Sequence, residues 1–181
     1  MTNHIDLGSV LRTVCDLYSN LVTRSTGAAV RREIEHVLTT LESPSLMVID
    51  FSQVGLLDFS CADEVLGKLL AHLRSEAAGQ AFVLVRGVSE HHLDAIEAVL
   101  ERYGLAVTVE TCDGQWHVIG PLEEPLRRTL EVVLDRGRID RDDVAILGAK
   151  VENLEPALDR LWRSGLLMRD DTGYVSLPSA L

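Results

Sequence analysis

The stretch from residue 46 to residue 73 most constrains what this chain can fold into, because it reads as a strand, a short acidic loop and a helix. Residues 46–49, Leu-Met-Val-Ile, form a continuous apolar run that is typical of a strand covered on both faces. Apolar residues then recur at helical spacing, at Ala62, Val65, Leu66, Leu69, Leu70 and Leu73. A buried strand that leads directly into an amphipathic helix indicates an α/β fold.

The loop between this strand and this helix carries a candidate phosphorylation site. Ser60 precedes the helix and Asp63 follows three residues later, which is a capping box with Asp in place of Glu. A phosphate on Ser60 would add roughly two negative charges beside Asp58 and Glu64, a change suited to releasing a partner. The alternative is a plain N-cap worth about 1 kcal/mol, and the pattern alone favours that alternative.

The same loop resembles that of the STAS superfamily, the fold of bacterial anti-sigma-factor antagonists. Their loop reads Asp-Ser-Ser/Thr-Gly with the first hydroxyl phosphorylated, whereas residues 58–61 read Asp-Phe-Ser-Cys, so that Phe59 stands at the phosphorylated position. Residues 60–64 resemble more closely the Ser-Phe-Ala-Asp-Glu run of a STAS-like family of unknown function, which also carries a Ser/Thr-Arg step like Thr23-Arg24. The resemblance covers about residues 20 to 120. It implies a STAS-like mixed sheet with helices, and a kinase-like ATPase or other signalling protein as partner.

The rest of this N-terminal region alternates helices and strands. Residues 1–22 fit either a helix or a strand, and we expect a strand near Ile5–Val10. Ser25 or Thr26 is expected to cap the next helix, which ends at Ser43-Pro44. Strands are expected at 81–85, 105–111 and 116–119, and a helix runs from Ser89 to Gly104.

The sequence predicts a second domain after Gly120-Pro121, which divides the chain into residues 1–120 and 121–181. Three helical segments, the third beginning at Val151, precede two strands at 166–169 and 173–177. This order resembles the small winged-helix fold, which implies DNA binding. The candidate DNA-binding residues are Arg160, Arg163 and Arg169. However, the expected reading helix begins with acidic residues and the segment has an excess of carboxylates, so that protein docking or dimerisation is favoured.

Composition excludes several classes of function. The net charge of −11 argues against broad attraction to nucleic acid or anionic lipid. No apolar run is long enough to span a membrane, and no secretory signal opens the chain, so we expect a cytoplasmic protein. The three cysteines are scattered and lack the spacing of metal ligands. The His91-His92 pair also lacks this spacing and is expected at a helix surface. We therefore expect no metal or cofactor.

These observations predict a non-enzymatic signalling adaptor of bacterial type, which binds a protein partner through the loop and helix at 58–70. The residues expected to contact the partner are Arg24, Asp58, Phe59, Asp63 and Glu64. Arg24 either pairs with Asp58, Asp63, Glu64 or a phosphorylated Ser60, or is a solvated arginine, and the sequence favours neither alternative. The alternative is a DNA-binding transcriptional regulator in which the STAS-like domain is a sensor or forms a homodimer.

Overall fold

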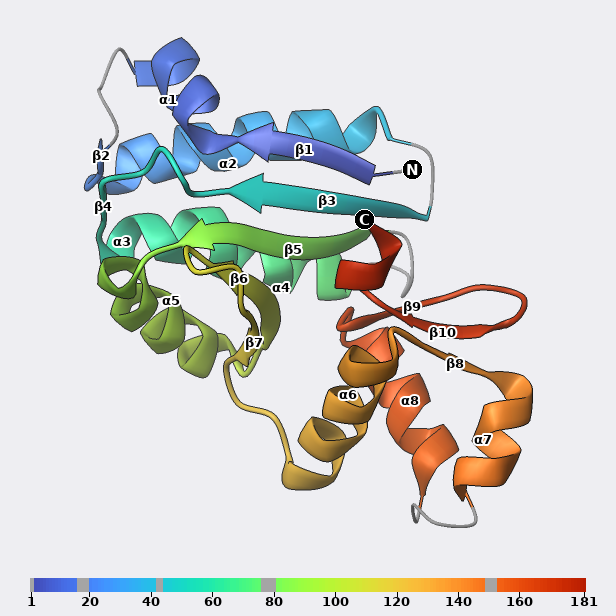
Figure 1. The fold of residues 1–181 in the computed structure, drawn as a ribbon. Helices are drawn as coiled ribbons and strands as arrows, with labels where there is room; N and C mark the ends of the chain where they lie inside the picture. Colours follow the sequence, from blue (N-terminus) through green and yellow to red (C-terminus); the bar gives the residue numbers. More distant parts are fainter. Residues whose placement is uncertain (1, 16–19, 42–43, 76–80, 149–152) are drawn as a thin grey trace.

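A five-stranded mixed sheet forms the centre of the computed structural model, which describes residues 2–15, 20–41, 44–75, 81–148 and 153–181 (Figure 1). The strand order is β1-β3-β5-β6-β7. These strands are Thr2–Asp6, Ser45–Asp50, Ala81–Val88, Val107–Thr111 and Trp116–Ile119. The first four strands are parallel and β7 is antiparallel to β6, which confirms the α/β class predicted from the sequence.

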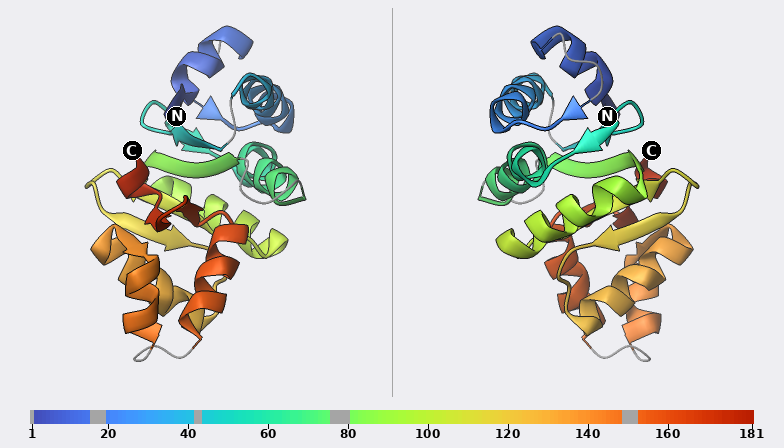
Figure 2. Two further views of the ribbon diagram at one scale, coloured as in Figure 1. Left: turned by 90° about the vertical axis from the view of Figure 1, so that its right-hand side faces the viewer. Right: turned by 90° about the vertical axis from the view of Figure 1, so that its left-hand side faces the viewer.

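The helices of the N-terminal region cover one face of this sheet (Figure 2). They are α1 (Leu7–Cys15), α2 (Arg24–Thr39), α5 (Glu90–Tyr103), and a continuous helix made of α3 (Phe59–Ala62), a π-helical segment (Asp63–Lys68) and α4 (Leu69–Ser75). The parallel strands lie in the sheet in the order in which they occur in the chain. Each crossover between parallel strands is right-handed and leads to the next strand on the same side, so all the connecting helices lie on one face of the sheet. The other face must be covered by another part of the chain.

The alternation of side chains along β3 and β5 shows how both faces are used. Met47, Ile49, Val83 and Val85 belong to the core beneath the helices. Leu46, Val48, Phe82 and Leu84 point to the other face, where they pack with Leu177 from the C-terminal end of the chain. Strands buried on both faces read as unbroken apolar runs, so the prediction of a doubly covered strand at 46–49 is confirmed.

The C-terminal region is a second, smaller assembly of helices and strands. Its elements are α6 (Glu124–Arg136), β8 (Arg138–Asp140), α7 (Arg141–Gly148), α8 (Leu154–Arg163), β9 (Leu167–Arg169), β10 (Gly173–Ser176) and a 3-10 turn (Pro178–Ala180). The three strands form an antiparallel sheet in the order β8-β10-β9. The three helices and the final strand pair were predicted, whereas β8 was not. Val151, the predicted start of the third helix, lies outside the described residues.

The predicted strand near Ile5–Val10 is wrong in its position. The strand is β1 and ends at Asp6, and α1 begins at Leu7. The Asp6 carboxylate ends the strand, because it accepts hydrogen bonds from the Gly8 N–H at 2.9 Å and from the Ser9 hydroxyl at 2.8 Å. Val10 therefore lies in a helix. The helix, which was the alternative to a strand for residues 1–22, begins at residue 7. None of the helices in the described ranges has both the length and the apolar character needed to cross a membrane.

Candidate functional site

A short parallel ribbon joins the two loops that lead into α2 and α3. It pairs β2 (Asn20–Leu21) with β4 (Leu56–Leu57), at the edge of the molecule where α2 and α3 begin (Figure 1). The Asp58 N–H donates to the Leu21 carbonyl at 2.9 Å and extends the pairing. The two loops therefore meet at one end of the sheet.

The residues that cap the two helices differ from those predicted. Thr23, not Ser25 or Thr26, caps α2 by accepting the Thr26 N–H at 3.3 Å. Asp58 caps α3 by accepting the Cys61 N–H at 2.8 Å.

Ser60 is therefore not the N-cap, because it already lies within α3. Its hydroxyl donates to the Asp58 carboxylate, at 2.9 Å from the nearer oxygen. Ser60 and Asp58 are both partly exposed, so the hydroxyl is held at the surface by the residue that caps the helix.

Asp63 and Glu64 are buried, contrary to the expectation that they present carboxylates to a partner. Their exposed fractions are 2% and 3%. They open the π-helical segment, where Asp63 contacts both α2 and α5 and Glu64 contacts α2. Such π-helical turns occur frequently at functional sites.

The two buried carboxylates are held by a network of cations from three helices. Arg24 of α2 contacts both, at 2.7 Å from Asp63 and 3.0 Å from Glu64, so that of the two alternatives for this arginine the pairing is correct. Asp63 also accepts the Tyr103 hydroxyl at 3.1 Å and lies 3.5 Å from Arg102. Glu64 is paired with Lys68 and, at 3.4 Å, with Arg31.

The network sets the protonation of both carboxyl groups. Burial alone would raise the pKa of Asp63, but hydrogen bonds from Arg24 and Tyr103 outweigh it and lower the pKa. Burial likewise opposes the charged form of Glu64, and hydrogen bonds from Lys68 and Arg24 lower its pKa below the ordinary value. Both groups are therefore ionised and neutralised at pH 7, and neither is poised as a general acid or base.

We predict that the free energy of unfolding falls as the pH drops through the acidic range. The folded-state pKa values lie below the ordinary values of 3.8 for Asp63 and 4.5 for Glu64, so the unfolded chain binds more protons here. Their stabilising effect is complete above about pH 5 and is lost as the pH falls through the folded values. Urea denaturation at a series of pH values measures this effect. A free energy that stays constant between pH 5 and pH 3 would contradict it.

The exposed part of the site is apolar. Val22, Leu56 and Phe59 are 44%, 55% and 40% exposed, and they are three of the five large hydrophobic side chains exposed in the described part of the chain. Leu56 lies in the β2-β4 ribbon, Val22 directly follows β2, and Phe59 lies two residues after β4. We call these three side chains the apolar surface. Asp58, Ser60 and the half-exposed side chain of Arg24 lie beside them in sequence and form its polar rim.

Behind the apolar surface, Cys61 packs between the two helices. A Cβ atom at Gly27 of α2 would lie 3.0 Å from the Cys61 Cα, so the two backbones approach closely here. Burial and the nearby charge of Asp58 raise the pKa of the Cys61 thiol to about 12. This thiol is protonated at neutral pH and is a poor nucleophile.

The three candidate DNA-binding arginines are all occupied by contacts within the chain. Arg160 makes a bidentate pair with Glu123, at 2.7 and 3.0 Å. Arg163 donates to Asp159 at 2.7 Å, and Arg169 lies 3.7 Å from the same residue. The Arg169 guanidinium also lies over the Trp162 and Tyr174 rings, at 5.4 and 5.5 Å from their centroids.

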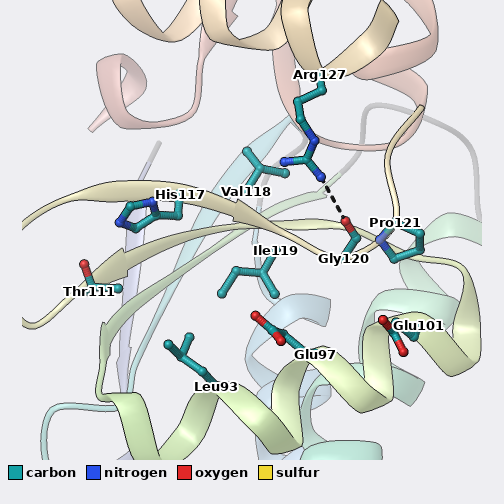
Figure 3. A pocket seen from close by; sticks show the side chains of 10 residues that line it. All are labelled: Leu93, Glu97, Glu101, Thr111, His117, Val118, Ile119, Gly120, Pro121 and Arg127. Atoms are coloured by element: carbon teal, nitrogen blue, oxygen red, sulfur yellow. Dashed lines mark hydrogen bonds between the residues drawn. The ribbon is translucent and has the colours of Figure 1, made fainter. Parts of the chain in front are cut away.

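A separate hollow of about 520 Å³ lies between α5 and the β6-β7 hairpin (Figure 3). Glu97 and Glu101 are on its α5 side, whereas His117 lies at the opposite end from Glu101, so that they do not form one catalytic cluster (Figure 3). Arg127 donates to the Gly120 carbonyl at 3.4 Å. Among the residues that the structure describes, no group of three or more His, Cys, Asp or Glu side chains could hold a metal ion.

His92 is a buried residue that the sequence did not reveal, since the His91-His92 pair was expected at the surface. His92 is 1% exposed, and its ring lies 5.9 Å from that of Phe51. Its Nδ1 accepts the Ser89 N–H at 3.2 Å, which fixes the start of α5. Burial lowers its pKa, so the imidazole is neutral at pH 7.

Comparison of the chain with protein-family models, with curated proteins and with solved structures finds no match. The function proposed below therefore depends on the geometry of the chain itself.

Proposed function

We propose that this chain is a non-enzymatic regulatory adaptor that binds a protein partner through the apolar surface and its polar rim. The observation that carries this proposal is the exposure of Val22, Leu56 and Phe59 around one ribbon. Exposed apolar side chains that gather at one place and have a polar rim are characteristic of protein interaction sites. The resemblance to anti-sigma-factor antagonists would make the partner a kinase-like ATPase or another signalling protein.

The ion-pair network behind this surface supports a binding role. Asp63 and Glu64 join α2, the π-helical segment and α5, so the loops that carry the apolar surface rest on a fixed base. A preorganised surface loses less conformational entropy when a partner docks. The contribution of Asp63 and Glu64 to binding is therefore indirect, whereas Phe59, Asp58 and Arg24 reach solvent.

Phosphorylation of Ser60 would act as a switch on this surface. The Ser60 hydroxyl donates to the Asp58 carboxylate, which also caps α3. A phosphate would remove that donor and place about two negative charges next to Asp58. Repulsion would draw Asp58 away from the Cys61 N–H and move the backbone that carries Phe59, so that the partner is released.

We further propose that residues 1–120 form a STAS-like domain and residues 121–181 a winged-helix domain. The parallel sheet with helices on one face supports the first proposal, and three helices with an antiparallel strand pair support the second. DNA binding by the second domain is the alternative function. It is disfavoured, because Arg160, Arg163 and Arg169 would have to exchange carboxylate partners for phosphates.

Phe59→Asp is expected to weaken capture of the partner by about tenfold or more, because a charge replaces an apolar anchor at the centre of the interface. The measurement is quantitative affinity capture from the native cells, followed by titration with the purified partner. Ile146→Asp is the matched control, because Ile146 is an exposed apolar residue of α7, outside the apolar surface, with 64% exposure. Equal capture by wild type and Phe59→Asp would refute the proposal.

A further inference from the structure

A second hollow, of about 450 Å³, lies where the N-terminal and C-terminal regions meet, and three arginines line it. Arg74 comes from the last turn of α4, and Arg160 and Arg163 come from α8. Leu105, Leu122 and Leu166 are among its apolar lining residues. We call this the arginine hollow. Hollows of this size are typical of small-molecule sites.

Arg74 is the unusual member of this group. No described residue forms a hydrogen bond or an ion pair with it, although a guanidinium carries five N–H donors. Its side chain lies against the backbone of Gly165, where an added Cβ would fall 1.9 Å from a guanidinium nitrogen. Burial lowers the pKa of Arg74 to about 10. A partly desolvated cation without an acceptor is costly, and a bound anion would remove that cost.

The charge around the hollow is opposite to that of the whole chain. Three arginines and one glutamate, Glu123, line it, whereas the chain has a net charge of −11. Glu123 is paired with Arg160, and Asp159 is paired with Arg163, so Arg74 provides the positive charge that no described carboxylate neutralises. A phosphate monoester carries about −1.5 to −2 at pH 7 and has three acceptor oxygens, so it can accept several donors of Arg74 and also compete with Asp159 for the exposed Arg163, since exposed ion pairs contribute little.

Helix C-termini explain only part of this arrangement. Arg74 and Arg163 lie in the last turns of their helices, where a cation complements the helix dipole. An exposed side chain meets that purpose equally well, as Arg163 does with 65% exposure. The Arg74 guanidinium packs against Gly165, and the helix dipole provides no hydrogen-bond acceptors for its N–H groups.

We propose that the arginine hollow binds a small organic phosphate, with Arg74 as the inner anchor, Arg163 at the rim and the leucines against the apolar part of the ligand. This site is independent of the apolar surface, because Phe59 and Arg74 lie at opposite ends of the continuous helix from α3 to α4. A ligand here would contact elements from both regions and stabilise their association.

Calorimetric titration of the full chain with phenyl phosphate tests this proposal. We expect binding by the wild type, and dissociation constants raised about tenfold or more by Arg74→Met and several-fold by Arg163→Met, because charged hydrogen bonds are lost. Arg128→Met is the matched control and should bind like the wild type, since Arg128 is 75% exposed on α6 and does not line the hollow. Benzoate, which has the same ring but one negative charge, should bind at least about tenfold more weakly.

Two further results separate a binding role from a structural one. Arg74→Met should raise the melting temperature of the ligand-free protein, because it removes a cation without a partner, and should abolish the rise that phenyl phosphate causes in the wild type. A wild type that shows neither heat of binding nor a melting shift would overturn the proposal. So would unchanged affinity in Arg74→Met, or equal affinity for benzoate and phenyl phosphate.

Discussion

Replacing Leu177 by alanine is expected to lower the free energy of unfolding by about 2 to 5 kcal/mol. Leu177 is fully buried, and it packs against Leu46, Val48, Phe82 and Leu84 on the face of the sheet that the helices leave open. The substitution would leave a cavity between the two regions of the chain, which the rigid sheet cannot close. Leu181→Ala is the matched control: this leucine is 45% exposed, and we expect a change within about 0.5 kcal/mol.

The same experiment shows whether the two regions unfold together. Trp116 and Trp162 pack against this cluster from the N-terminal and C-terminal regions, so their fluorescence reports the contact, while circular dichroism reports the helices. We expect both signals to change in one denaturant transition, at a lower denaturant concentration in Leu177→Ala. Two separated transitions in the wild type, or equal effects of Leu177→Ala and Leu181→Ala, would contradict this expectation.

The contact of Leu177 with the sheet crosses the boundary predicted at Gly120-Pro121. The sequence predicts the boundary between β7, which ends at Ile119, and α6, which begins at Glu124. However, a fragment that ended there would expose Leu46, Val48, Phe82 and Leu84 on one face of the sheet. The unbroken apolar runs of β3 and β5 indicate cover on both faces, but not the segment that supplies it. Leu177 lies far along the chain, and local periodicity contains no information on such a distant partner.

At the candidate site, too, some features could be predicted from the sequence and others could not. The sequence indicates, as one of two alternatives, a pairing of Arg24 with acidic residues, and the structure identifies these as Asp63 and Glu64. From the sequence, Asp63 and Glu64 are both expected at the surface, because carboxylates are rarely buried unless they are paired. Two features of the sequence could have indicated their burial in ion pairs. Both residues lie between Ala62 and Val65 of the apolar stripe, and Lys68 follows Glu64 at a spacing of four residues.

Other features could not be predicted from local pattern. Asp58 and Ser60 both suit an N-cap, and only the backbone conformation of Asp58 decides between them. Arg74 looks like an ordinary cation at a helix end, and its contact with Gly165 depends on how the two regions dock. Pairings such as Arg160 with Glu123 likewise join distant elements.

The double variant Asp63→Asn, Glu64→Gln is expected to lower the free energy of unfolding at pH 7 by about 3 kcal/mol. Each substitution keeps the size of the side chain and removes the charge that Arg24 and its neighbours neutralise. Removing one side of a buried pair costs about 3 to 5 kcal/mol, and the lower end applies because Arg24 and Lys68 remain partly hydrated. The control Glu124→Gln removes a carboxylate with 64% exposure that pairs with Arg128, and should cost less than about 0.5 kcal/mol.

The pH dependence of the double variant identifies the cause of this loss. In the wild type, protonation of Asp63 and Glu64 destabilises the fold as the pH falls below about 5, since their folded pKa values are lowered. The double variant has no such protons to gain, so the difference between the two proteins should stay constant from pH 7 to about pH 5 and then shrink as the pH falls to 3. A difference that stays constant down to pH 3 would mean that the amides disturb packing, and the network would then have no electrostatic role. A shrinking difference would establish that the charges of Asp63 and Glu64 stabilise the fold.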